Sequence, residues 1–465
     1  MPVAAELAFA SVRVLGQKLR AGEFSAVELA EFFLQRLETL GPRFNAVVRV
    51  TRETALEAAT QADRELKGGK DRGPLHGIPY GAKDLLATRG IPTTWGAAPY
   101  KDRLIDEDAT IIVRLREAGA VLVAKLAMVE IAGGMGYRQA NAAFTGPGLN
   151  PWDIKTWAGG SSSGSGSAVG AGLVPFAIGS ETWGSIVTPA GYCGVTGLRP
   201  TYGRVSRHGA MALSWTMDKL GVLSRTADDS GLVLHAMAGA DPLDPSAAQR
   251  PYLYPEEAAP KTFKFATLKG AADKVQPEIR TNYQASLEIL KSLGTLEEID
   301  LPNLPYSAVA STIIACEMAA AFEGLVDTGD VWELTAPEDR PGCHAALWIP
   351  AKDYINAFRV RRKIQVELDD LLAKFDAVVS PTLATVSPPL DQSFGEYQRG
   401  FSSSLIGGAG NVAGVPAITV PNGFGEGGRP TALQFVGRAF DENRLLTIAA
   451  AYQSATEWHK RTPTV

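Results

Sequence analysis

Helical patterns and short apolar strands alternate along this chain, and this alternation limits the possible folds more than any other feature. Between Asp108 and Lys125, a helical pattern closed by Gly119 is followed by an apolar strand. The arrangement recurs where the small-residue stretch 163–172 precedes the apolar run 174–178. Further strand candidates lie at 377–380, 417–420 and 433–436, and helical stretches lie at 279–293, 352–374 and 442–458. Such alternation predicts an α/β fold, with a mixed or parallel sheet covered by helices on both faces.

The N-terminal segment 1–72 is predicted to be helical and to pack on the core. A capping box at Ser25 starts one amphipathic helix, and an Ala-rich stretch predicts a second over 52–67. Prolines and acidic residues gather in 240–260 and exclude a core strand there, so we expect a surface excursion. Since no internal repeat is visible, the chain is predicted to form a single domain over 1–465.

Charge and cysteine usage exclude several classes of function. The 45 Lys and Arg against 50 Asp and Glu give a net charge of −5 without a basic block, so no nucleic-acid partner is expected. The longest apolar run, 168–178, contains Gly and Pro and is too short to span a bilayer. Cys193, Cys316 and Cys343 are far apart, which indicates neither a disulfide framework nor a zinc site. A cytoplasmic protein without a membrane partner is expected.

The most unusual stretch is the Gly/Ser segment 159–167. An isolated run of this kind is typical of a flexible linker, but this one follows the turn 150–153 and precedes an apolar helix and strand. A small-residue loop at a helix start exposes N–H groups that hold an anion or an oxyanion. No nucleotide-binding loop occurs, because 408–413 follows no convincing strand and Pro416 would interrupt the helix that should come next. No cofactor is therefore expected.

A candidate nucleophile lies in the second small-residue turn, 179–185. Ser185 follows Gly184 shortly after an apolar strand, as a serine nucleophile does, although most such serines only satisfy turn backbone. The usual base would be a histidine, but the chain has only five, scattered and outside any triad motif: His76, His208, His235, His344 and His459. The alternative base is Lys83, which would have to be kept neutral by burial.

These motifs together resemble the amidase signature family over nearly the whole chain. The resemblance rests on segments 73–79, 83–84, 159–162, 179–186, 189–190, 193–203, 414–418 and 433–438. It implies a large, mostly parallel mixed central sheet and a Ser–cis-Ser–Lys catalytic set. Matched by motif, Ser185 is the nucleophile, Ser161 the bridging serine and Lys83 the base.

The resemblance also implies where the substrate would be held. Backbone N–H groups around the nucleophile would form the oxyanion hole, and nearby residues would contact the substrate. The oxyanion set is Thr182, Trp183, Gly184 and Ser185, and the predicted substrate contacts are Trp183, Gly160 and Ser162. Neither a metal nor a cofactor is implied.

Four positions depart from the family pattern. Ser163 and Trp183 replace glycines, Glu181 replaces an aspartate, and Val187 stands where the family often has arginine. A bulky residue two positions before the nucleophile would be strained in a left-handed backbone. Its indole is expected either to lie near the scissile bond, favouring flat or aromatic groups, or to pack into the core.

The resemblance implies a stand-alone serine hydrolase of amide-type C–N bonds. Its partner would be a small-molecule amide, aryl amide or carbamate (urethane), and the enzyme would be a monomer or homodimer. The alternative is the glutaminase (A) subunit of a tRNA-dependent amidotransferase, which would need partner subunits. Trp183 and Val187 weigh against that alternative. A catalytically dead scaffold is disfavoured because Lys83, Ser161 and Ser185 are all present.

Overall fold

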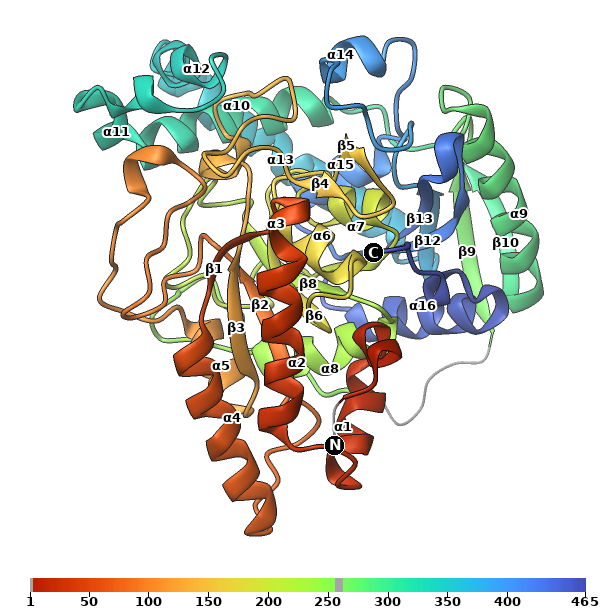
Figure 1. The fold of residues 1–465 in the computed structure, drawn as a ribbon. Helices are drawn as coiled ribbons and strands as arrows, with labels where there is room; N and C mark the ends of the chain where they lie inside the picture. The colour runs from red at the N-terminus through yellow and green to blue at the C-terminus, as the bar shows by residue number, and fades with distance from the viewer. Residues whose placement is uncertain (1–2, 256–261) are drawn as a thin grey trace.

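The computed structural model describes residues 3–255 and 262–465, and one large β-sheet forms its centre (Figure 1). Within the described residues this sheet has 11 strands. From edge to edge they are β1 (Val47–Val50), β3 (Val121–Leu126), β2 (Pro79–Lys83), β6 (Phe176–Glu181), β8 (Lys219–Ser224), β7 (Thr196–Arg199), β12 (Ala417–Phe424), β13 (Pro430–Val436), β11 (Ala377–Pro381), β9 (Phe263–Leu268) and β10 (Gly294–Ile299). Two short strands, β4 (Leu149–Asn150) and β5 (Asp153–Trp157), form a separate pair.

Parallel pairing is found in two groups of strands. β3, β2 and β6 are parallel near one edge, and β11, β9 and β10 are parallel at the other. The strands between these groups, and the edge strand β1, pair antiparallel. The predicted large mixed sheet is confirmed, and its parallel character belongs to the two flanking groups. The middle is antiparallel partly because β12 returns directly as β13 through the short turn 425–429, which needs no crossover helix.

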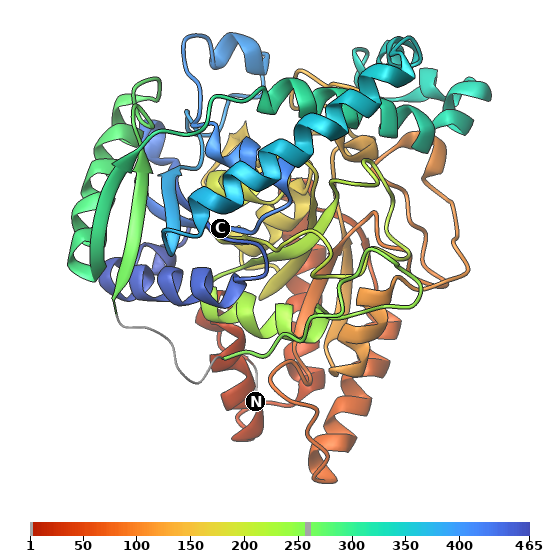
Figure 2. The same ribbon diagram turned by 180° about the vertical axis from the view of Figure 1, so that it is seen from behind.

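Helices cover both faces of the sheet, as predicted. Figure 1 shows α2, α6 and α7 in front of the strands, and Figure 2 shows α13 crossing the opposite side. The α-helices are α1 (Val12–Arg20), α2 (Ala26–Thr39), α3 (Gly41–Phe44), α4 (Arg52–Lys67), α5 (Thr110–Glu117), α6 (Ser163–Gly170), α7 (Val187–Cys193), α8 (Ala227–Met237), α9 (Pro277–Leu293), α10 (Tyr306–Ala321), α11 (Glu323–Asp327), α12 (Asp339–Ala346), α13 (Ala351–Leu372), α14 (Phe394–Tyr397), α15 (Ile406–Ala413) and α16 (Glu442–Thr456). Short 3₁₀ helices are η1 (Ala5–Phe9), η2 (Ala98–Tyr100), η3 (Glu130–Gly133), η4 (Asp330–Glu333), η5 (Glu426–Gly428) and η6 (Trp458–Lys460).

The Gly/Ser segment forms helix α6, and every residue of that helix is buried. A Cβ atom on Gly164 would lie 2.4 Å from the Ala46 carbonyl oxygen and 2.5 Å from the Ala127 nitrogen. A Cβ on Gly166 would lie 2.8 Å from Pro189. Because these approaches leave no room for side chains, the small residues let the helix pack directly on the backbone of its neighbours. The segment is therefore a packed core helix, and the linker interpretation is wrong.

The N-terminal segment 1–72 contributes to both the helical layer and the sheet. The predicted capping box is present at the start of α2, and α4 spans the predicted range. Helices α2 and α4 pack on each other and on β3. The segment also contains β1, which the sequence analysis did not predict. Strand β1 extends the main sheet, and the single domain stays a prediction.

The predicted excursion 240–260 is anchored at its start. Asp241 and Asp244 are buried, although acidic residues here were expected to indicate a surface loop. The Asp241 carboxylate accepts hydrogen bonds of 2.5 Å from the hydroxyls of Thr110 and Ser206, so its burial is compensated. Leu243 is 63% exposed between the two acids. The last part of the excursion, 256–260, lies outside the described residues.

Other sequence predictions concern membranes and metals. In the described part of the chain, no helix has the length and apolarity needed to cross a bilayer. Over the same residues, no cluster of His, Cys, Asp or Glu has the makings of a metal site. Cys193, Cys316 and Cys343 are free thiols.

Candidate active site

The three residues predicted to act together, Lys83, Ser161 and Ser185, lie where the inner strands β2 and β6 end. Strands β2 and β6 are parallel neighbours, so their carboxyl ends meet at the same edge. Lys83 is the last residue of β2, and the turn that carries Ser185 follows β6. Ser161 lies in the loop just before α6, which packs against both strands.

Strand β6 ends later than the sequence predicted. We expected an apolar strand over 174–178 and a turn from 179, but the strand continues through Ser180 and Glu181. The physical reason is ladder pairing, because Glu181 pairs with Lys219 on the antiparallel neighbour β8. The polar residues of this stretch are therefore held in the sheet, and only 182–185 form the turn.

Lys83 is fully buried and contacts two serines. Its Nζ donates to Ser161 Oγ at 2.7 Å and to Ser180 Oγ at 2.8 Å. Burial lowers the pKa of Lys83 to about 7, although the negative charges of Asp218 and Glu181 act in the opposite direction. A substantial fraction of this amine is thus neutral near pH 7, which a proton-accepting lysine requires.

Ser161 follows a cis peptide bond with Gly160, in line with the cis-Ser that the resemblance implied. Its carbonyl oxygen accepts from the Val129 nitrogen at 3.0 Å. The next residue connects to the nucleophile turn, because the Ser162 nitrogen donates to the Ser185 carbonyl oxygen at 3.3 Å. The loop before α6 and the turn after β6 are therefore joined through their backbones beside Lys83.

Ser162 has a structural role. Ser162 is fully buried, and its hydroxyl donates to the Ser180 carbonyl oxygen at 3.2 Å. Ser162 Oγ in turn accepts from the Ser180 nitrogen at 3.3 Å. The hydroxyl thereby joins the loop to β6, and the substrate contact by this side chain stays a prediction. Gly160 is buried too, and a Cβ there would lie 2.7 Å from side-chain atoms of Val129 and Trp157.

The turn 182–185 offers unused polar groups. Within the described residues, the Ser185 hydroxyl takes part in no hydrogen bond, and neither do the backbone N–H groups of these four residues. Gly184 has a φ of +93°, a left-handed conformation that favours glycine. The turn thus presents a free hydroxyl and free N–H groups, while Ser185 as a whole remains 9% exposed.

The buried carboxylate of Glu181 holds this turn by accepting hydrogen bonds from the residues that follow it. Glu181 Oε2 accepts from the backbone nitrogens of Ile186 at 2.8 Å and Val187 at 3.0 Å. Its Oε1 accepts from Arg199 at 2.9 Å and from Asn411 Nδ2 at 3.0 Å. Burial alone would raise the pKa of Glu181, but the charges of Arg199 and Lys219 outweigh burial and hold that pKa below its usual value. The carboxylate is therefore ionised and holds the start of α7 in place.

Two further charged groups support the same turn. Thr182 Oγ1 donates to Asp218 Oδ1 at 2.5 Å, and Asp218 Oδ2 accepts from the Leu213 nitrogen at 2.8 Å. Lys219 Nζ reaches the Thr182 carbonyl oxygen at 3.5 Å. Burial lowers the pKa of Lys219 well below its usual value. Lys219, the first residue of β8, and Asp218 just before it therefore both contact Thr182 at the start of the nucleophile turn.

Trp183 does not pack into the core. Its side chain is 39% exposed, and the left-handed conformation falls on Gly184, so Trp183 avoids the strain considered above. A Cβ on Gly408 would lie 2.7 Å from the indole ring, so the ring rests on helix α15. Glycine at 408 thus makes room for the tryptophan that replaces the glycine of the family pattern.

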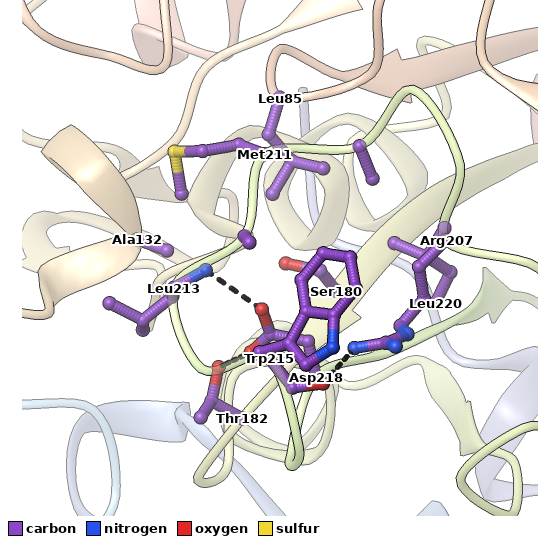
Figure 3. A pocket seen from close by; sticks show the side chains of 12 residues that line it. Leu85, Ala132, Ser180, Thr182, Arg207, Met211, Leu213, Trp215, Asp218 and Leu220 are labelled. Carbon is purple, nitrogen blue, oxygen red and sulfur yellow. Dashed lines mark hydrogen bonds between the residues drawn. The ribbon is translucent and has the colours of Figure 1, made fainter. Parts of the chain in front are cut away.

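A narrow cavity opens beside these residues (Figure 3). Its volume of about 20 Å³ has room for one or two water molecules. Its lining includes Ser180, Thr182, Asp218, Trp215 and Arg207. The Arg207 guanidinium donates to the Trp215 carbonyl oxygen and, at 2.7 Å, to Ser246 Oγ, so its charge is used within the protein.

A family model described as Amidase matches residues 28–446 of this chain. The chain belongs to the amidase family. It is an amidohydrolase that acts on amide C–N bonds, and the amidase signature resemblance is confirmed.

Curated relatives of this amidase are similar to it over their whole length. It is 36% identical to the A subunit of glutamyl-tRNA(Gln) amidotransferase from Chloroflexus aggregans, with 98% of this chain and 99% of the relative covered. The protein of the same name from Carboxydothermus hydrogenoformans is 34% identical, with the same coverage.

Solved structures confirm the fold of this amidase. Peptide amidase from Stenotrophomonas maltophilia superposes with a TM-score of 0.84 at 29% identity, covering 97% of this chain and 98% of that one. The A subunit of glutamyl-tRNA(Gln) amidotransferase from Thermotoga maritima gives a TM-score of 0.80 at 26% identity, covering 98% and 97%.

Several residues of the amidase site were missed by sequence reasoning. Ser180, which contacts Lys83, directly follows Gly179 in a stretch already singled out, so its position was a usable signal. Arg199 lies in segment 193–203, on which the resemblance rests, but nothing there gave it a role in the site. Asn411 and Asp218 look like ordinary polar residues in the sequence, and all three reach Glu181 or the turn only through the fold.

Proposed function

We propose that this amidase cleaves its substrate through an acyl-enzyme on Ser185. Ser185 Oγ attacks the carbonyl carbon and gives its proton to Ser161 Oγ, while the Ser161 proton passes to neutral Lys83. When the tetrahedral intermediate collapses, the C–N bond breaks and the relay returns the proton to the leaving amine. Water then attacks the ester carbonyl, and the same three residues carry its proton as Ser185 is released.

The observation that carries this proposal is the buried contact between Lys83 and Ser161. At 2.7 Å, a neutral Lys83 nitrogen can accept the Ser161 proton directly. The Ser185 hydroxyl is not hydrogen-bonded to Ser161, and only backbone atoms join the two segments. We expect this last contact to form when substrate is bound, as catalytic hydrogen bonds often do.

The free N–H groups of Thr182, Trp183, Gly184 and Ser185 are proposed to hold the oxyanion. Each donor aimed at the developing charge contributes about 3 kcal/mol in the transition state. These N–H groups make no hydrogen bond within the described residues, which supports this role, because a turn with internal hydrogen bonds would use them as donors. The Glu181 carboxylate, through Ile186 and Val187, would keep the turn in this open form.

Two substrate classes compete for this mechanism. A stand-alone amidase would accept neutral amides, anilides or carbamates, and Trp183 and Val187, which depart from the family pattern, favour this candidate. The names of the curated relatives favour the second candidate, the glutaminase subunit of a tRNA-dependent amidotransferase. That role would require partner subunits and recognition of the charged groups of glutamine.

A hydrolysis screen of the purified protein separates the two candidates. Aliphatic amides, anilides, aryl carbamates and glutamine are each offered without a partner, and amine or ammonia release is measured. We expect anilides or carbamates to be turned over by the protein alone. Turnover of glutamine only, and only after amidotransferase subunits are added, would establish the second candidate.

Trp183→Gly tests whether this side chain selects the substrate. Because the Trp183 backbone N–H belongs to the proposed oxyanion hole and its indole is partly exposed, we expect kcat/KM for an aryl amide to fall about tenfold, in keeping with the ~1.5 kcal/mol of an aromatic contact. The kcat/KM for a small aliphatic amide should change less. Trp332→Gly removes another exposed tryptophan and is the control. Equal losses on both substrates, with a large drop in melting temperature, would assign Trp183 to packing only.

A further inference from the structure

A second and much larger hollow lies next to the narrow cavity. It has a volume of about 720 Å³ and lies among the C-terminal part of α10, residues 346–354 and residues 212–216. Ala212 and Trp215 line both the hollow and the cavity, so the two spaces adjoin each other at these residues. We call this hollow the α10 groove.

The walls of the α10 groove are mainly apolar. They include Ala319, Ala320 and Leu347, and within the described lining no residue is basic. The buried Glu317 carboxylate is fully used, because it accepts from the Thr216 nitrogen at 3.0 Å, from Ser214 Oγ and from the Tyr354 hydroxyl. A carboxylate in this groove would find no cation, whereas an uncharged apolar group would lose water-exposed surface.

Trp215 separates the groove from the cavity. Trp215 lines the cavity together with Ser180 and Arg207, and Figure 3 shows its indole near the Arg207 side chain. Its backbone is fixed, because its carbonyl oxygen accepts from the Arg207 guanidinium and from the Tyr202 hydroxyl at 3.2 Å. The indole itself is 61% exposed and contacts Arg207 only through its face, at 5.1 Å. The side chain can therefore change rotamer without moving the loop.

From these observations we propose that the α10 groove binds an uncharged apolar substituent of the substrate, and that Trp215 controls its passage from the cavity. This proposal rests on the amide hydrolysis proposed above, and it narrows the substrate class. The substrate has an extended apolar acyl or amine half, reaching from the carbonyl at Ser185 past Ser180 and Trp215 to the alanines of α10. It carries no negative charge on that half.

Two ladders of anilides, meaning two series of substrates with increasing chain length, test the groove. One lengthens the acyl chain from acetyl to hexanoyl, and the other lengthens an alkyl group on the ring. We expect kcat/KM to rise about threefold per methylene along one ladder, since each partly buried CH₂ contributes to binding. A terminal carboxylate on the longest chain should abolish the gain. Flat ladders, or an equal gain with the carboxylate, would overturn the proposal.

Variants that fill the groove test whether the dependence of kcat/KM on chain length arises in the α10 groove. Ala320→Trp places an indole in the groove and should flatten the responsive ladder. Ala308→Trp is the matched control, because Ala308 is an exposed alanine on the same helix outside the groove, and it should leave the ladder unchanged. A ladder that survives Ala320→Trp would place the apolar site elsewhere. Trp215→Ala should change the slope, because it removes the partition.

Binding measurements test the α10 groove independently of turnover. Ser185→Ala, which is expected to be inactive, is titrated with the same ladders by calorimetry. Tighter binding of longer chains that is lost in Ala320→Trp would support the groove as an apolar binding site. If the wild type then hydrolyses none of the anilides, only the proposed function is contradicted. If the wild type hydrolyses anilides but neither assay depends on chain length, the groove fails and the proposed function stands.

Discussion

Ser185→Ala is expected to lower kcat by at least about 10⁴-fold, because loss of the nucleophile removes the covalent route entirely. The fold should be unaffected. Within the described residues the Ser185 hydroxyl makes no hydrogen bond, so its removal leaves no buried group without a partner. Turnover of a chromogenic anilide, and the melting temperature of both proteins, measure the two halves of this prediction.

Ser180 is the rival nucleophile, because its hydroxyl lies 2.8 Å from the Lys83 nitrogen. A fluorophosphonate reagent followed by peptide mapping decides between the two serines. We expect the adduct on Ser185 and none in the Ser185→Ala variant. Ser180→Ala is the matched control and should still be labelled. An adduct on Ser180 would reassign the nucleophile and reject the proposed relay.

Lys83→Arg should lose about 10²- to 10⁴-fold in kcat/KM, nearly as much as Lys83→Ala. A guanidinium cannot be deprotonated in a protein, so it cannot take the Ser161 proton, although it keeps the positive charge. Lys125→Arg is the matched control, because Lys125 is also fully buried but pairs with Asp84 at 3.1 Å. Substantial activity in Lys83→Arg would show that another group is the base.

The pH dependence follows from the same lysine. Because burial lowers the pKa of Lys83 to about 7, the protonated, inactive form dominates below that pH. We expect kcat/KM to be half its plateau near pH 7 and about one hundredth of it at pH 5, two pKa units lower. A profile that stays flat between pH 5 and pH 8 would contradict a lysine base.

The lowered pKa also affects stability. Above pH 7 the folded protein has released the Lys83 proton, while the unfolded chain keeps it up to its ordinary value of 10.5. The unfolded state therefore binds more protons in this range, so the contribution of Lys83 to the unfolding free energy increases with pH. Comparing wild type with Lys83→Met by urea unfolding between pH 7 and pH 9 should reveal this slope as a difference.

Local patterns were enough to predict some of the helices, but not β2, which carries Lys83. The small residues of 163–172 and the apolar periodicity of 52–67 predicted α6 and α4, because the information lies within one element. Motif resemblance then placed Lys83 and Ser161, which the structure joins at 2.7 Å although 78 residues separate them. Neither prediction required knowledge of the strand order.

What could not be predicted depends on strand pairing. The strand boundary at 178 was wrong because Ser180 and Glu181 read as turn residues until β8 is placed beside them. The Glu181 carboxylate is held by Arg199 of β7, which lies beyond β8 in the sheet, and by Asn411 of α15. Their roles follow from the order of the sheet, which a single sequence does not encode locally.

The packing of α6 also limits how this enzyme can be reshaped in the laboratory. Where a single methyl group on Gly164 would overlap the backbone of Ala46 and Ala127, saturation mutagenesis would yield mostly misfolded clones. The exposed positions around Trp215 and Ala320 have no such restriction. A library intended to broaden substrate scope should therefore randomise the positions around Trp215 and Ala320 and keep Gly164 and Gly166 of α6 fixed.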